Sequence, residues 1–343
     1  MSKEIYIADL NVDDNITEFF MVKSISLRVG SNGKQYLDLL LGDCSGEISG
    51  KKWDISDEES IGLSRIKEGD IVKIRAIVNE WNGAKQLRVG KIRLLSESDD
   101  IVIGDYVKAA PERAEDMFSY IRERALSVSD PELRSMALCF LDENKDRLMY
   151  YPGAMRNHHS EMAGLLYHIK RMLVMGEKAC EVYEGLDRDW VVTGVILHDM
   201  EKLNELESNS FGVSPGYSFE GKLLGHIAQG VKAVELMAGK LGVSEEKKIM
   251  LEHMILSHHY EPEFGSPVRP MFPEAEMLHY LDMVDAKMYD FEDNLRMVGP
   301  GQFTERVRTL DGRMLYKPSF ARENADGQEV SAQAPASKRK NSL

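Results

Sequence analysis

Residues 191–202 read VVTGVILHDMEK, and this stretch decides how the second half of the chain folds. The residues from Val191 to Leu197 are apolar on almost all sides of a helix, which is typical of a helix buried in a bundle. Asp199 follows at its end, and a buried carboxylate is costly unless it is paired or bound to a cation. Lys202 lies one turn beyond His198, on the same face. The stretch therefore predicts a buried helix that ends in a metal-binding His-Asp pair.

The histidines are confined to one part of the chain. All nine lie between His158 and His279, and several stand beside acidic residues. Imidazole and carboxylate groups are the ligand set of zinc, manganese, iron and similar ions, and a helical bundle can collect them around a central ion. The candidate ligands lie in five predicted helices or at their ends and are His168, the pair His198-Asp199, His226, His258 or His259, and Asp282. A lone helical histidine is more often a packed or surface residue, an interpretation that stays open for His253 and His279.

The first part of the chain, residues 16–95, has the pattern of strands. In QYLDLLLGD (35–43), leucines alternate with the residues of the other face, which predicts a strand with one buried side. Asn82-Gly83 separates two further alternating runs and is a strong signal for a tight hairpin. Five such strands, with a longer and partly helical connection in the middle, resemble the OB-fold barrel, which binds oligonucleotides on the face of its second and third strands.

Composition bounds the class of protein. A chain of 343 residues with 43% hydrophobic residues can bury the cores of two domains. The net charge of −14 argues against a protein that coats nucleic acid by bulk electrostatics, although a local basic groove stays compatible with it. No apolar run is long enough to span a membrane and no charged-then-apolar leader is present, so we expect neither a membrane partner nor targeting. The three well-separated cysteines fit a reducing cytoplasm.

Five segments carry a resemblance to a known family. They are HHSEMAGLLYH (158–168), GVILHDMEKL (194–203), GKLLGHIAQGV (221–231), ILSHHYEPEFGSPVRP (255–270) and EAEMLHYLDMVDAKM (274–288). Their pattern of His, His-Asp and Asp resembles the HD-domain metal-dependent phosphohydrolases, and the additional His226 and His258 resemble the members that hold two ions. The complete set resembles the YhaM family of bacterial 3'–5' exoribonucleases, which join an N-terminal OB-fold to an HD domain. The resemblance covers residues 16 to about 300.

Two positions depart from the family pattern. Tyr260 follows the His-His pair where relatives commonly carry Gly, and Met200-Glu201 stands between His-Asp and Lys where they commonly have Ile-Gly. Neither change removes a ligand. Tyr260 can narrow the mouth of the pocket or stack on a base, so we expect it to affect substrate preference more than metal binding.

The resemblance implies a site for two divalent ions. One ion would be held by His168, His198, Asp199 and Asp282, and the other by Asp199, His226 and His258, with His259 as the competing choice. Mn²⁺ is the favoured ion, with Co²⁺, Fe²⁺ and Mg²⁺ as alternatives. Two such ions lower the pKa of a shared water and clamp the phosphate oxygens for in-line attack. The products would be nucleoside 5'-monophosphates.

The resemblance also implies supporting roles around the ions. Lys202 would neutralise the charge that develops on the phosphoryl oxygens, and Asp285 would orient a metal ligand. His158 and His159 would contact the scissile phosphate or protonate the leaving 3'-oxygen, unless they form only the polar start of a helix.

Aromatic and basic residues of the barrel suit a single-stranded nucleic acid. Trp53 and Tyr36 are the expected stacking platforms for the bases. Each stacked base contributes ~1–3 kcal/mol to binding. Candidates for contacts with the nucleic acid also include Lys34, Lys51, Lys52 and Arg88. An aromatic residue at a strand end is as often part of a core or an interface, and that alternative stays open.

We therefore expect a multidomain protein in which an all-β OB-fold barrel precedes an all-α HD-domain bundle. The expected divisions are an OB-fold over residues 1–100, a helical connection over 101–155, an HD domain over 156–320 and a disordered tail over 321–343. The expected function is a cytoplasmic 3'–5' exoribonuclease of single-stranded RNA, with single-stranded DNA as a second substrate. Three alternatives stay open: a phosphohydrolase of small nucleotides, a nucleic-acid-binding protein with a non-catalytic HD domain, and an HD-type oxygenase with mixed-valence iron. A homo-oligomer is compatible with the sequence.

Overall fold

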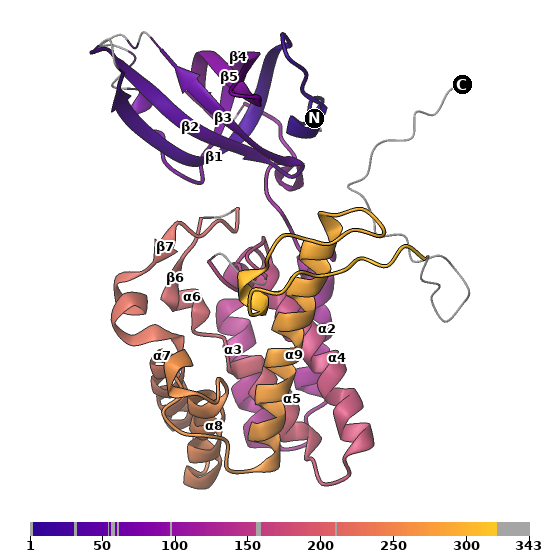
Figure 1. Ribbon diagram of the computed structural model, residues 1–343. Helices are drawn as coiled ribbons and strands as arrows, with labels where there is room; N and C mark the ends of the chain where they lie inside the picture. Colours follow the sequence, from indigo (N-terminus) through magenta and orange to yellow (C-terminus); the bar gives the residue numbers. More distant parts are fainter. Residues whose placement is uncertain are drawn as a thin grey trace, which may run out of the picture.

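A β-barrel forms the N-terminal part of the protein, and a bundle of helices follows it (Figure 1). The computed structural model describes residues 3–30, 33–53, 55, 59, 62–96, 98–155, 159–209 and 211–320. The order of these two parts confirms the predicted fold class, an all-β barrel followed by an all-α bundle. The predicted disordered tail, 321–343, lies outside the described residues.

The barrel has the strand order of an OB-fold. Its strands are β1 (Asn15–Val29), β2 (Gln35–Asp43), β3 (Gly46–Lys52), β4 (Ile71–Trp81) and β5 (Ala84–Leu94). It closes in the order β1-β2-β3-β5-β4. The β3–β5 pair is parallel and the other neighbouring pairs are antiparallel. This is the small five-stranded barrel that the resemblance to the OB-fold implies.

Two local sequence patterns of the barrel form the structures that they predict, the alternating leucines of β2 and the Asn82-Gly83 pair. Leu37, Leu39 and Leu41 of β2 are all buried in the barrel core, so the alternation marks the inner face. Asn82 and Gly83 join β4 to β5 and both have a positive φ, of 51° and 77°. This is the conformation that favours Asn-Gly in two-residue hairpins.

The bundle is built around one helix, α5 (Arg188–Leu197), that is buried along most of its length. The helices are α2 (Ala114–Leu126), α3 (Pro131–Leu148), α4 (Gly164–Val182), α5 (Arg188–Leu197), α6 (Lys202–Glu205), α7 (Phe219–Leu241), α8 (Glu245–Ser257) and α9 (Pro273–Arg296). Every residue of α5 from Val191 to Leu197 is buried, and α5 packs against α3, α4 and α9. Asp130 caps the start of α3 by accepting hydrogen bonds from the backbone N–H groups of Glu132 and Leu133.

The helices predicted as a connection are part of the same bundle core. Met117 and Ile121 of α2 and Met136 of α3 are completely buried in the hydrophobic cluster that also contains Leu165 of α4 and Val195 of α5. The boundary at residue 156 therefore does not coincide with a break in packing within the described residues. The exact division of the chain stays a prediction.

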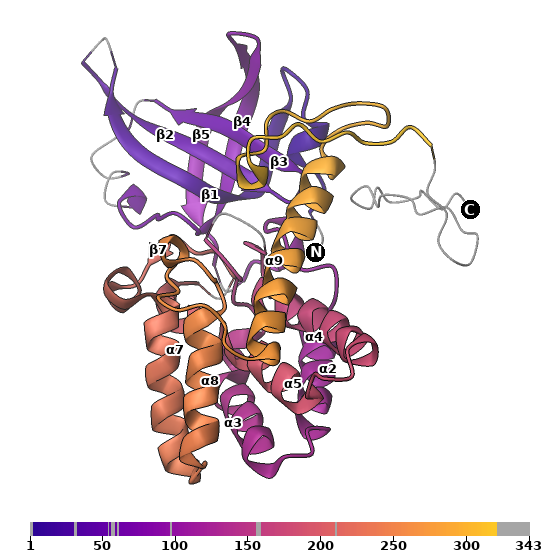
Figure 2. The ribbon, with the colours of Figure 1, turned by 60° about the horizontal axis from the view of Figure 1, so that its bottom comes forward.

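The barrel rests on the bundle through the segment between β6 (Leu206–Glu207) and β7 (Gly216–Tyr217), which both views place toward the barrel (Figure 2). Phe211 and Val213 pack against a cluster that includes Ile71 at the start of β4. The side-chain amide of Asn209 donates a hydrogen bond of 3.1 Å to the carbonyl oxygen of Gly69. Among the described helices, none is long and apolar enough to cross a membrane.

Candidate metal centre and nucleic-acid interface

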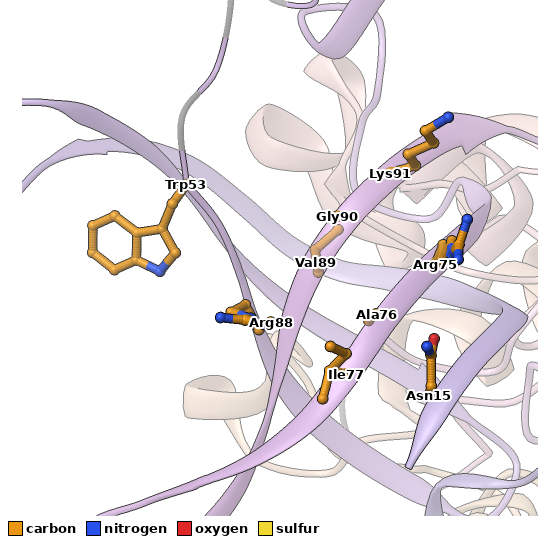
Figure 3. A pocket seen from close by; sticks show the side chains of 9 residues that line it. All are labelled: Asn15, Trp53, Arg75, Ala76, Ile77, Arg88, Val89, Gly90 and Lys91. Carbon is orange, nitrogen blue, oxygen red and sulfur yellow. The ribbon is translucent and has the colours of Figure 1, made fainter. Parts of the chain in front are cut away.

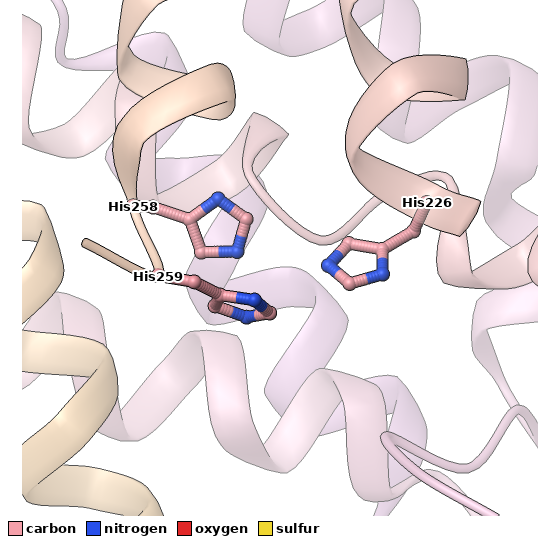
Figure 4. Close-up of side chains that lie close together, drawn as sticks. All are labelled: His226, His258 and His259. Carbon is pink, nitrogen blue, oxygen red and sulfur yellow. The ribbon is translucent and has the colours of Figure 1, made fainter. Parts of the chain in front are cut away.

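Five helices bring the predicted ligands together. His168 lies in α4 and Asp282 in α9, whereas His198 and His258 are the first residues after α5 and α8. His226 lies in α7 directly after a kink at Gly225, whose φ is 67°. The ligand atoms of His168, His198 and Asp282 lie within 4.8 Å of one another, and so do those of His226, His258 and His259. Figure 4 shows the second group, with its three imidazoles facing one another.

Asp199 lies between the two groups. Its Oδ2 atom is 3.3 Å from His198 Nε2 and 3.6 Å from His168 Nε2. Its Oδ1 atom is 3.4 Å from His226 Nε2 and 3.9 Å from His258 Nε2. Each carboxylate oxygen thus faces a different group of histidines, which is the arrangement that a carboxylate bridging two ions requires.

All five histidines present the same ring nitrogen to the centre. His198, His258 and His259 bond through Nδ1 to the backbone carbonyl oxygens of Val195, Ile255 and Phe264, at 2.9, 2.7 and 2.7 Å. His168 and His226 bond through Nδ1 to the carboxylates of Asp285 and Glu205, at 2.8 and 3.0 Å. A carbonyl or carboxylate oxygen only accepts, so Nδ1 donates and Nε2 keeps its lone pair for a cation. His258 and His259 meet this condition equally.

The centre contains buried polar atoms without a hydrogen-bond partner. They are Asp199 Oδ1, His226 Nε2 and His258 Nε2. Buried polar atoms are rarely left unpaired, because each costs free energy. Burial, together with His259 and His198, lowers the pKa of His258 well below its ordinary value, so its imidazole is neutral. Nitrogen lone pairs beside carboxylate oxygens, with no thiolate, fit a divalent transition ion.

Lys202 contacts the carboxylate of Asp199. Its Nζ lies 2.6 Å from Asp199 Oδ2. Burial alone would raise the pKa of Asp199, but the charges of Lys202 and His198 hold it well below the ordinary value. The helix α5 ends at Leu197, the stretch from Asp199 to Glu201 is a turn, and α6 begins at Lys202. The break lets His198, Asp199 and Lys202 converge.

Asp285 contacts His168 on the side of its ring that faces away from the candidate ligand atom Nε2. Its Oδ2 accepts hydrogen bonds of 2.8 Å from His168 Nδ1 and 2.7 Å from His159 Nε2, and its Oδ1 accepts one of 2.5 Å from Arg171 Nε. Burial opposes ionisation, but the hydrogen bonds from His159 and His168 keep the pKa of Asp285 far below its ordinary value. This contact is the one expected of a group that orients a ligand.

His159 occupies a supporting position. Its side chain is completely buried, its Nε2 is bonded to Asp285, and its backbone has a left-handed φ of 57°. These contacts direct the imidazole toward Asp285, and its predicted catalytic role stays untested. His158 lies outside the described residues.

The sequence reasoning missed Glu205. Its Oε1 accepts hydrogen bonds of 3.0 Å from both the backbone N–H and Nδ1 of His226. Burial would raise the pKa of Glu205, but the contacts with His226 lower it, so the carboxylate is charged. Glu205 is the last residue of α6, one turn after Lys202. This helical spacing is the signal in the sequence that could have identified it as a neighbour of the site.

The barrel brings the predicted aromatic residues together. The rings of Tyr36 and Trp53 are stacked with centroids 4.4 Å apart, and Lys51 Nζ lies 5.3 Å from the centroid of Tyr36. Trp53 remains 41% exposed, so the indole keeps a surface for a ligand. The proposed role of Lys52 needs correction: its side chain is buried and pairs with Glu59 at 3.1 Å, so it is not available to a phosphate.

A groove lies beside Trp53 on the outside of the barrel. It has a volume of about 500 Å³ and is open to solvent (Figure 3). Its lining residues are Asn15, Trp53, Arg75, Ala76, Ile77, Arg88, Val89, Gly90 and Lys91. Arg88 and Trp53 were predicted from the sequence, whereas Arg75 and Lys91 were not.

Known proteins are similar to this chain in sequence. The HD domain family matches residues 165–287. A "3'-5' exoribonuclease YhaM" from a Geobacillus species is 39% identical over 316 residues, covering 92% of this chain and 95% of the relative. Proteins of the same name from Halalkalibacterium halodurans and Oceanobacillus iheyensis are each 37% identical, covering 90% and 92% of this chain and 95% and 97% of the relatives.

Among solved structures, the second OB-fold domain of replication protein A from Methanococcus maripaludis covers 29% of this chain and 100% of its own, at 21% identity and a TM-score of 0.23. The identities to the three curated relatives extend over nine tenths of the chain and include both the barrel and the helical bundle. The chain therefore belongs to the YhaM family of 3'–5' exoribonucleases.

Proposed function

We propose that this protein is a metal-dependent 3'–5' exoribonuclease that hydrolyses single-stranded RNA to nucleoside 5'-monophosphates, with single-stranded DNA as a second substrate. One observation carries the proposal: five imidazole Nε2 atoms and the carboxylates of Asp199 and Asp282 converge on one centre, where buried polar atoms lack partners. This donor set, in a chain of the YhaM family, supports hydrolysis at a pair of metal ions.

The two ions would share Asp199. The ligands of one ion would be His168, His198, Asp199 and Asp282, and those of the other Asp199, His226, His258 and His259. We include both His258 and His259 because each donates Nδ1 to a backbone carbonyl and keeps Nε2 for the ion. Mn²⁺ is the favoured ion, with Co²⁺, Fe²⁺ and Mg²⁺ as alternatives. The imidazole nitrogens favour a transition ion over Mg²⁺, which prefers oxygen ligands.

The residues of the centre have distinct tasks. When bound, the ions activate water and neutralise charge on the phosphate oxygens. Asp199 is held ionised by Lys202, and Asp285 and Glu205 fix the ring orientations of His168 and His226. Once a phosphate enters, the ammonium of Lys202 is close enough to the centre to balance the additional negative charge. His158 and His159 stay candidates for the group that protonates the leaving 3'-oxygen.

The barrel would hold the RNA upstream of its 3' end. Trp53 and Tyr36 supply the stacking surface, and Lys51 and Arg88 supply positive charge beside it. Stacking on aromatic side chains tolerates any base, which suits an enzyme that removes successive nucleotides.

The test is hydrolysis of single-stranded RNA labelled at either end. With Mn²⁺ we expect a 3' label to appear at once as a mononucleotide, and a 5' label to remain on a ladder of shortening products. EDTA should stop both. Release of a 5'-labelled mononucleotide at the outset contradicts the direction. Hydrolysis of free nucleotides alone would favour a small-nucleotide phosphohydrolase, and binding without hydrolysis would favour a binding protein.

A further inference from the structure

Three cations that line one groove of the barrel make no ion pair with the residues that the structure describes, unlike Arg28 and Arg93. Arg28 pairs with Asp38 at 3.1 Å, and Arg93 pairs with Asp99 at 2.6 Å. Arg75, Arg88 and Lys91 are exposed, and none of them makes an ion pair or side-chain hydrogen bond with the residues that the structure describes. All three line the groove of about 500 Å³ beside Trp53.

An irregularity in the sheet produces this grouping. Arg75 pairs with Lys91 and Ala76 with Val89, so the register shifts and Gly90 is left as the additional residue of β5. Such a bulge changes the direction of the side chains that follow it. In a regular strand Arg88 and Lys91 would point to opposite faces, but the bulge brings both to the outer face. Arg75 lies directly across from Lys91 on β4.

The groove suits a flexible phosphodiester backbone. It is open along β4 and β5, and Figure 3 shows Trp53 at one side of the groove and Arg75 and Lys91 at the other. Asn15 at the start of β1 adds an amide that can donate or accept. Cations spread along a groove beside an exposed aromatic ring are the combination that binds single strands without regard to sequence.

We propose that the groove over β4 and β5, and not only the strand 2–3 face, binds the phosphate backbone of the RNA through Arg75, Arg88 and Lys91. The bases would stack against Trp53 at the edge of the groove. This proposal rests on the proposed ribonuclease function and adds to it the surface that carries the strand. It also explains how a chain with a net charge of −14 binds a polyanion: the local charge of the groove is positive.

Affinity and its dependence on salt test the proposal. The full-length holoenzyme is titrated with a fluorescent 20-nucleotide poly-U whose 3'-terminal linkages are phosphorothioates, at several salt concentrations. For single strands the slope of log K against log salt is about −0.7 for each neutralised phosphate. The triple variant Arg75→Ala/Arg88→Ala/Lys91→Ala should therefore lose about 2 units of slope and bind at least about tenfold more weakly at low salt.

A matched control removes the same charge elsewhere. Arg28→Ala/Arg93→Ala/Arg122→Ala changes the net charge equally but removes cations that already have carboxylate partners. Its slope should stay within about half a unit of the wild type. A single substitution gives a second comparison: a Cβ at Gly90 meets only the carbonyl oxygen of Arg75, at 3.5 Å. Gly90→Asp should weaken binding severalfold, and the isosteric Gly90→Asn should not.

The outcomes separate this inference from the proposed function. If the wild type degrades RNA while the triple variant keeps its affinity and salt slope, the groove does not hold the strand and the inference is wrong. Equal losses in both triple variants would also overturn it, because they would show a general charge effect. A failure of the wild type to hydrolyse RNA would instead contradict the proposed function.

Discussion

Removal of the Glu205 carboxylate should weaken metal binding through His226, although Glu205 is not itself one of the proposed metal ligands. Glu205 accepts two hydrogen bonds of 3.0 Å from His226, one from the backbone N–H and one from Nδ1. In Glu205→Ala both donors lose their acceptor, and the imidazole loses the contact that fixes its orientation and tautomer. Groups that orient a ligand in this way typically contribute 10–100-fold in metal affinity, which corresponds to about 1.4–2.7 kcal/mol.

The effect should be confined to one of the two ions. Apo protein is titrated with Mn²⁺ in a calorimeter, and we expect Glu205→Ala to weaken the ion held by His226 while the ion held by His168 and His198 keeps its affinity. Glu205→Gln retains an oxygen that can accept one hydrogen bond, so its loss should be smaller. Glu207→Ala, an exposed carboxylate two residues away, is the control. Equal weakening of both ions, or no weakening, would refute this assignment of Glu205.

Other changes test the remaining parts of the account. Lys202→Ala should lower turnover at least tenfold while metal content is preserved; loss of the ions in metal analysis would make its role structural. Trp53→Ala should weaken binding of poly-A and poly-U alike, by ~1–3 kcal/mol, and an effect on only one of them would argue against stacking. The folded-state pKa of Asp285 lies below its unfolded value of about 3.9, so its contribution to stability is present above that pH and is lost as the pH falls below it. Asp285→Asn should therefore flatten the acid limb of the unfolding free energy of the apo protein in urea, and an unchanged limb would show that Asp285 is not ionised in the fold.

The features that the sequence could predict depend on regular periodicity. The alternating leucines of β2 identify its inner face, and Asn82-Gly83 identifies the hairpin, because each signal is local to one element. The apolar run of α5 likewise predicts burial on all sides, and it places His198 and Asp199 at the end of a buried helix. The candidate ligands could be proposed because each of α4, α5, α7, α8 and α9 carries a histidine or an aspartate in the helix or directly after it.

The features that could not be predicted depend on irregular backbone and on long-range contacts. The bulge at Gly90 brings Arg88 and Lys91 to one face, and simple alternation assigns them to opposite faces. His159 adopts a left-handed conformation and turns inward to Asp285, a contact across 126 positions of sequence. Lys52 appears on a strand as a free cation, but the fold buries it against Glu59. In each case the tertiary fold determines the surroundings of the side chain.

The bridging role of Asp199 is the central claim, and the turnover and metal content of Asp199→Asn test it most directly. Asparagine keeps the shape of the side chain but removes its negative charge. In the wild type Oδ2 of Asp199 faces the group with His198, and Oδ1 faces the group with His226. We predict that the variant retains the helical circular dichroism of the wild type, binds fewer than two ions per chain, and hydrolyses single-stranded RNA at less than about a hundredth of the wild-type rate. Turnover above a tenth of the wild-type value, with both ions bound, would contradict the two-metal mechanism.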